Sequence, residues 1–199
     1  GDELSVIEAD GRKYSINAFR ITDATTTPPT ESTTELDCAR NPLWIQTVAT
    51  QFGLAFDRCL GTATAATGQV LGQAGDKVAD LVRQTLSVQG DALGEKDLAL
   101  VMIGMNDVLE LYGQYPTLSS DVLLERARIR GQALGNFVNQ LATTGPAVVV
   151  LTVPDIGLSP FALAQNVSTG DATRSVLLTN LVEAFNNSMS VRLINDGRL

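Results

Sequence analysis

The segment at residues 98–109, LALVMIGMNDVL, constrains the fold most, because its apolar run stops abruptly at Gly104. An apolar run of this length bounded by a glycine predicts a strand buried on both faces of a parallel sheet. Ligands of open α/β sheets bind outside the carboxyl ends of such strands. Asn106 and Asp107 are the first polar side chains after the strand and are therefore candidate site residues. The alternative is a simple strand-to-helix turn in which Asp107 caps the next helix.

A second apolar run, AVVVLTV at residues 147–153, predicts another buried strand, with a turn at residues 154–157. Helices are expected over residues 121–143 and 173–193 from their apolar spacing. The alternation of strands and amphipathic helices favours an α/β fold with helices on both faces of a parallel sheet. The residues expected to face the core are Leu123, Ala127, Leu134, Val138 and Leu141 in the first helix, and Leu178, Leu181, Val182, Phe185 and Met189 in the second. The charged run Glu125, Arg126, Arg128 and Arg130 is interpreted as a solvated helix face.

The N-terminal part of the chain gives weaker signals. Residues 25–34, TTTPPTESTT, predict an exposed irregular loop because of the paired prolines. A helix is expected to begin at Asn41 as N-cap, with Pro42 in its first turn. Residues 60–75 are small and rich in glycine, which is consistent with a short strand and a tight loop. The residues expected to face the core are Trp44, Ile45, Val48, Ala49 and Phe52, followed by Val78, Leu81, Val82 and Leu86 in a helix over 76–86.

Composition excludes several classes of function. The 199 residues carry a formal net charge of -8, which argues against nucleic acid as a partner because phosphate binding needs clustered Lys and Arg. No apolar run approaches the roughly 18 residues that a transmembrane helix needs. Histidine is absent, so the commonest general base and transition-metal ligand is missing. Asp2, Glu3 and Asp107 have no known ligand spacing, and we expect neither a metal nor a cofactor.

Two cysteines, Cys38 and Cys59, favour one disulfide and hence a secreted or periplasmic protein, with free thiols as the alternative. The chain begins at Gly1 without Met or a signal-peptide pattern, which indicates a mature or excised segment.

Four short motifs in order resemble those of the SGNH, or GDSL, ester hydrolases, particularly the secreted bacterial lipases and esterases. GDELS at residues 1–5 is similar to the Gly-Asp-Ser-Leu-Ser block of the family, and Ala74-Gly75-Asp76 to its second block. Gly104-Met105-Asn106-Asp107 matches the third block, Gly-x-Asn-Asp, and residues 151–161 resemble the segment after the fourth strand. The resemblance implies a single domain over residues 1–199 with a three-layer α/β/α, flavodoxin-like parallel sheet. It also implies a carboxylesterase or lipase acting through an acyl-serine intermediate on a small-molecule ester or lipid.

The resemblance assigns three site residues. Glu3 stands at the nucleophile position, while Gly75 and Asn106 correspond to oxyanion donors. Asp2 corresponds to a turn-stabilising residue.

The chain departs from the family in three ways. Glu3 replaces the serine, no Asp-x-x-His block is present, and the strand before the first block is missing. The domain is therefore expected to be incomplete at both ends and the chain inactive as given. Ser5 is a poor substitute nucleophile, because a residue two positions on points elsewhere. The alternatives are a non-catalytic relative that binds an acyl or glycan ligand, and a fragment completed by a partner chain, such as a complementing C-terminal segment.

Overall fold

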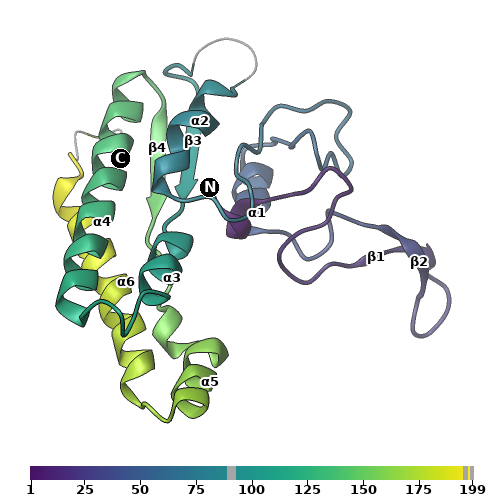
Figure 1. Cartoon of the computed structure of the whole chain (residues 1–199). Helices are drawn as coiled ribbons and strands as arrows, with labels where there is room; N and C mark the ends of the chain where they lie inside the picture. The colour runs from purple at the N-terminus through teal and green to yellow at the C-terminus, as the bar shows by residue number, and fades with distance from the viewer. Residues whose placement is uncertain (89–92, 195–196, 198–199) are drawn as a thin grey trace. The chain divides into compact units, whose positions relative to one another are not determined.

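The computed structural model describes residues 1–88, 93–194 and 197 (Figure 1). The chain divides into two compact units, which we describe separately. Unit 1 consists of Gly1 and Glu3–Ala74, and unit 2 consists of Asp2 and Gly75–Leu199. The expectation of a single SGNH-like domain over residues 1–199 stays a prediction.

Unit 1 contains a hairpin and one α-helix. Strand β1 (Phe19–Asp23) pairs antiparallel with β2 (Thr30–Leu36), and most side chains of both strands are exposed. A single 3₁₀ turn, η1 (Glu3–Ser5), precedes them, and helix α1 (Trp44–Gln51) follows. The prediction of an irregular loop over residues 25–34 is wrong for its second half, which lies in β2. The β-branched threonines there favour a strand, and Pro28-Pro29 lie in the turn between the two strands.

Helix α1 begins later than the sequence indicates. Its N-cap is Leu43, whose N–H donates to the side-chain oxygen of Gln46 at 2.9 Å. The prediction of Asn41 as N-cap is wrong, because Asn41 has a left-handed backbone with φ of 52°. Ile45 and Ala49 are buried as expected, whereas Phe52, which follows the last helical residue, is exposed.

A disulfide joins Cys38 to Cys59 and confirms the pairing favoured from the sequence. Nearby, the buried ammonium of Lys13 donates to three backbone carbonyls, those of Cys38 at 3.0 Å, Arg40 at 2.7 Å and Asn41 at 2.8 Å. Burial lowers the pKa of Lys13, and the carboxylate of Asp37 opposes this effect. Lys13 and the disulfide therefore hold the loop that leads into α1.

Residues 60–75 form no strand, contrary to the expectation for this stretch. Gly68 makes only an isolated bridge with Phe56, which also bridges Cys59. Small residues without a periodic apolar pattern provide no face that a strand can bury.

Unit 2 is mixed α/β. Strand β3 (Leu98–Met102) pairs parallel with β4 (Ala147–Leu151), in register from Leu98 opposite Ala147 to Met102 opposite Leu151. The described residues do not show the full parallel sheet of a three-layer α/β/α fold. The helical elements of unit 2 are η2 (Val78–Asp80), α2 (Leu81–Leu86), α3 (Met105–Tyr112), α4 (Ser120–Thr143), η3 (Ile156–Leu158), α5 (Pro160–Thr169) and α6 (Thr173–Arg192). No described helix is both long and apolar enough to cross a membrane.

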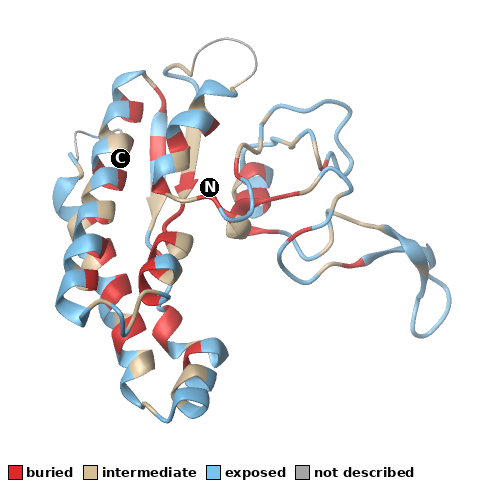
Figure 2. Ribbon diagram, in the orientation of Figure 1, coloured by how far each residue is buried: buried red, intermediate tan, exposed pale blue. Residues whose placement is uncertain are grey.

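The two parallel strands are less buried than predicted. Of their side chains, Val101 and Val148 are buried, whereas Val149 is exposed (Figure 2). The prediction of strands buried on both faces is therefore wrong for the described structure. A two-stranded ladder is too narrow to cover both faces of its own strands, so most of the core lies among the helices.

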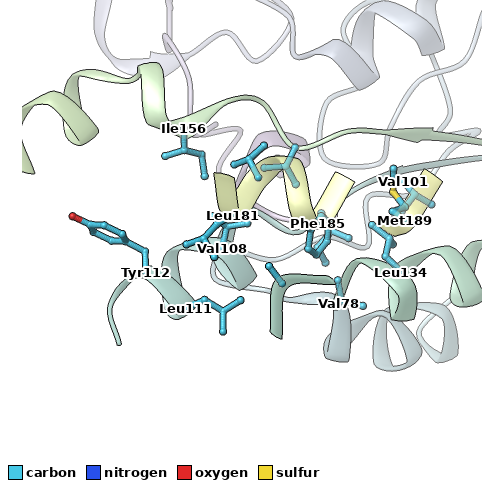
Figure 3. Packing of buried hydrophobic residues seen from close by; sticks show 14 of the residues in the cluster. Val78, Val101, Val108, Leu111, Tyr112, Leu134, Ile156, Leu181, Phe185 and Met189 are labelled. Carbon is cyan, nitrogen blue, oxygen red and sulfur yellow. The ribbon is translucent and has the colours of Figure 1, made fainter. Parts of the chain in front are cut away.

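Helices α4 and α6 pack along each other and form most of this core. Every residue predicted to face the core in these two helices is buried, which confirms both apolar stripes. Figure 3 shows Leu134, Phe185 and Met189 within the same apolar cluster. Two glycines of α4 allow the backbones to approach closely. A Cβ atom at Gly131 would overlap the carbonyl oxygen of Phe185, and one at Gly135 would lie 2.8 Å from that of Met189.

The other predicted helix of unit 2 is only partly correct. Its first turn is the 3₁₀ turn η2, and α2 then continues to Leu86. Val78 and Leu81 are buried as expected, but Val82 and Leu86 are exposed. Helix α5 was not expected at all, although Ser159 caps it by accepting the N–H of Ala162, and Pro160 is its first residue.

Candidate functional site

The residues predicted to form the site in unit 2 lie on two segments joined by hydrogen bonds. One segment follows β3, where Gly104 is the N-cap of α3 and has a φ of 124°. Asn106 and Asp107 lie in the first turn of α3, just beyond the carboxyl end of β3. The other segment, Gly75-Asp76, precedes η2.

Asn106 contacts the segment that contains Gly75. Its side-chain Nδ2 donates to the backbone carbonyl of Asp76 at 3.1 Å. Gly75 is exposed and has a φ of 82°, and a Cβ atom added there would meet nothing within 4 Å. Glycine is therefore favoured at position 75 by its backbone conformation and not by lack of space. The structure thus brings Asn106 next to the residue that follows Gly75.

Glu3 belongs to unit 1, where it begins the half-buried turn η1. Ser5 in the same turn is buried, and its hydroxyl accepts a hydrogen bond from the indole N–H of Trp44 at 3.2 Å. Asp2 belongs to unit 2. Asp2 is almost completely buried, and its N–H donates to the carbonyl of Met102, the last residue of β3, at 3.3 Å. This placement suits a structural role for Asp2.

Both carboxylate oxygens of Asp76 are held by side chains of α2. Arg83 donates to Oδ1 at 2.6 Å, and Gln84 donates to Oδ2 at 2.6 Å. Asp76 is buried, so these contacts compensate a carboxylate removed from water. They also fix the backbone on which Gly75 lies.

Asp107 has a different role from the helix cap considered for it. Its Oδ2 accepts the N–H of Val78 at 2.9 Å, so Asp107 caps the first turn of η2 and not that of α3. Arg130 of α4 donates to the carbonyl of Asp107 at 3.1 Å and lies 3.4 Å from its Oδ1. The interpretation of Arg130 as part of a solvated face is therefore wrong. Arg126 and Arg128 are exposed as expected.

Two further charges complete a network around Asp107. Lys77 lies 2.7 Å from Glu110, and Arg130 lies 2.5 Å from the other oxygen of Glu110. Burial raises the pKa of Asp107, although the N–H of Val78 and the guanidinium of Arg130 oppose this effect. The hydrogen bonds from Lys77 and Arg130 lower the pKa of Glu110, and Glu110 in turn raises that of Lys77.

The two carboxyl groups are expected to change stability with pH in opposite directions. Because the folded pKa of Asp107 is raised, its stabilising contribution is present below its ordinary pKa and is lost as pH rises through the folded pKa. The contribution of Glu110, whose folded pKa is lowered, is present above its ordinary pKa and is lost as pH falls through the folded pKa.

Substitution separates these two effects. Between about pH 3 and about pH 7, Asp107→Asn should gain stability relative to the parent chain as pH rises, and Glu110→Gln should lose it. Urea unfolding at both pH values measures the changes. Equal shifts in the two variants would contradict this assignment.

The sequence gives little indication of this network. Lys77, Glu110 and Arg130 are separated by at least 20 positions along the chain and belong to no common motif. The network and the Asp76 contacts hold the loop before η2 against α3, which keeps Gly75 and Asn106 on a rigid support. Among the described residues, no group of three or more His, Cys, Asp or Glu side chains is arranged to hold a metal ion. A shallow hollow of about 550 Å³ in unit 1 is lined by residues 8–10 and 12–14, and none of the predicted site residues lines it.

Comparison of the chain with models of protein families, with curated proteins and with solved structures found no match. The assignment to the SGNH/GDSL hydrolases therefore stays a prediction from the four motifs.

Proposed function

We propose that this chain is built on the framework of an SGNH/GDSL ester hydrolase, of the carboxylesterase or lipase type, and that it is inactive as given. The observation that carries the proposal is the hydrogen bond from the Asn106 amide to the carbonyl of Asp76, beside Gly75 and beyond the end of β3. Two segments that are 30 residues apart in the sequence, and that match two separate motifs of the family, are directly joined.

The chemistry of these groups fits ester hydrolysis. Attack on an ester carbonyl places negative charge on its oxygen, and fixed N–H donors stabilise that charge. Gly75 has no side chain to shield its main chain. Arg83 and Gln84 hold Asp76, which follows Gly75, and Arg130 holds Asp107, which follows Asn106. The proposed framework requires oxyanion donors that are held rigidly in this way. The three-layer sheet of the family is part of this proposal, as is a secreted or periplasmic location, which the disulfide supports.

Position 3 explains the proposed inactivity. A carboxylate at Glu3 cannot form an acyl-serine ester. The chain also has no histidine to remove a proton from a nucleophile.

Restoring both missing groups tests the proposal. We expect Glu3→Ser, supplied with imidazole as an external base, to become acylated at position 3 by p-nitrophenyl butyrate. The adduct is located by mass spectrometry of proteolytic fragments, and release of p-nitrophenol is expected to exceed that of Glu3→Ala by at least about tenfold. The alanine variant with the same imidazole concentration corrects for direct hydrolysis by imidazole. Equal release without an adduct would refute the proposal.

Ligand binding without catalysis is the second candidate. It is favoured because the hydrogen bond between Asn106 and Asp76 is present although position 3 is substituted. Calorimetric titration of the unmodified chain with short-chain carboxylates and acetylated sugars tests it. Saturable heat that is lost in Asn106→Ala supports this function, and an absence of heat with all these ligands contradicts it.

A further inference from the structure

Two polar side chains of helix α5, Gln165 and Asn166, face the protein, and the ring of Phe161 packs edge-on against that of Tyr112 with 6.2 Å between the centroids. The hydroxyl of Tyr112 in α3 donates to the side-chain oxygen of Gln165 at 3.2 Å. Asn166 makes two hydrogen bonds with Ser175 of α6, donating to its hydroxyl at 2.8 Å and accepting its N–H at 2.9 Å. Ala162, one turn before Gln165 and Asn166, is completely buried. The inner side of α5 is thus held by polar contacts as well as by Phe161 and Ala162.

The opposite side of the helix is apolar and exposed. We call it the α5 outer face and define it as Pro160, Leu163, Ala164 and Val167, all of which are exposed. Positions 160, 163, 164 and 167 have the spacing of one helical face. Leu163 is 56% exposed and Val167 is 84% exposed. In the usual amphipathic helix such an apolar stripe faces the core, whereas here it faces away from it.

The outer face carries no charge. No charged residue occurs between Asp155 and Asp171, although the whole chain has a net charge of -8. The polar residues that border the face are Ser159, Ser168 and Thr169, which have only hydroxyl groups. An apolar surface without Lys or Arg matches an uncharged partner and has no attraction for an anionic one.

Its size argues against a second copy of the chain. A stable protein interface buries about 800 Å² on each partner and uses about 20–30 residues a side. Four side chains on one ten-residue helix fall well short of that. A lipid surface needs no such area, because a short helix can bury its whole apolar face at the boundary between head groups and acyl chains.

We propose that the α5 outer face docks on the surface of electrically neutral lipid. Docking would bring the chain to esters at a lipid surface, which are then its substrate class. In that respect the inference rests on the proposed function. The inner hydrogen bonds to Tyr112 and Ser175 fix the helix in the orientation that docking requires.

Sedimentation with sucrose-loaded phosphatidylcholine vesicles tests docking with the full chain. We expect the parent chain to pellet with the vesicles, and Leu163→Ser/Val167→Ser to partition at least about tenfold less, because two exposed apolar side chains are lost. The matched control is Ile129→Ser/Leu86→Ser, at residues that are 56% and 82% exposed on α4 and α2. This control is expected to stay within about twofold of the parent. Adding phosphatidylserine should weaken binding through repulsion of the acidic chain.

Several outcomes would overturn the proposal. They are no pelleting of the parent chain, equal loss in both double variants, stronger binding to anionic vesicles, or a dimer in solution that the α5 variant abolishes. If the α5 variant unfolds, Val167→Trp replaces it at a position that is 84% exposed. Brominated phosphatidylcholine should then quench its tryptophan emission more strongly than that of the parent chain, whose one tryptophan is Trp44. An absence of this quenching would also refute docking. The acylation assay on Glu3→Ser contains no vesicles, so failure of the proposed function is distinguished from failure of docking.

Discussion

Replacing Gly131 by alanine is expected to destabilise the protein by about 3 kcal/mol, the upper end of the usual range for overpacking. The added methyl group would overlap the carbonyl oxygen and carbonyl carbon of Phe185 in α6. These are backbone atoms, so no side chain can rotate away, and α4 and α6 must separate. Separation would open the largest part of the core, around Leu134, Phe185 and Met189. Urea unfolding followed by far-ultraviolet circular dichroism measures the loss.

Gly113 provides the matched control. It caps the end of α3 with a φ of -61°, and a Cβ atom there would meet its nearest neighbours at 3.5 and 3.6 Å, which is ordinary contact. We therefore expect Gly113→Ala to change stability by less than about 1 kcal/mol, and to raise it if the unfolded state dominates the effect. Equal effects of the two substitutions would contradict the close approach of α4 and α6.

Replacing Arg130 by methionine is the second large change, with an expected loss of about 3 kcal/mol. Methionine keeps most of the apolar stem but removes the charge that contacts both Asp107 and Glu110. The side chain of Asp107 is only 4% exposed, and that of Arg130 is 28% exposed, so water replaces the lost contact poorly. A buried carboxylate without its cation is the costly product. Thermal and urea unfolding measure the loss.

Arg126→Met is the control on the same helix. Arg126 is exposed and donates to the side-chain oxygen of Gln114, which is uncharged, at 2.8 Å. The expected loss is below about 1 kcal/mol, as for other exposed polar contacts. Adding Asp107→Asn to Arg130→Met should recover part of the loss, because no buried charge then remains. A double variant less stable than Arg130→Met alone would contradict this explanation.

The long helices could be predicted from the sequence because their apolar spacing extends over many turns. Helix α4 was expected over residues 121–143 and spans Ser120–Thr143, and α6 was expected over 173–193 and spans Thr173–Arg192. Their stripes are buried because both helices pack against each other along one apolar face. A parallel sheet was predicted from the alternation of strands and helices, and β3 pairs parallel with β4.

Shorter elements were predicted poorly because the apolar spacing that identifies a helix or strand extends over fewer residues in them. Helix α5 was missed since Leu163 and Val167 face outward whereas the polar Gln165 and Asn166 contact Tyr112 and Ser175, against the usual pattern. The second half of the 25–34 segment pairs with β1 although it is polar, because both faces of that hairpin are largely exposed.

The sequence by itself determined the α/β alternation, the core stripes of the two long helices, the disulfide and the glycine that ends the apolar run after β3. Only the tertiary structure decided which charged groups are buried and which backbones touch. Arg128 and Arg130 belong to the same charged run of α4, yet Arg128 pairs with Glu125 whereas Arg130 contacts Asp107, because the packing of α4 against α3 places it there. Likewise, Asn106 reaches the carbonyl of Asp76 through the packing of two segments 30 residues apart. The apolar spacing along the sequence predicts which residues are buried, whereas contacts between distant segments depend on how the helices and strands pack against one another.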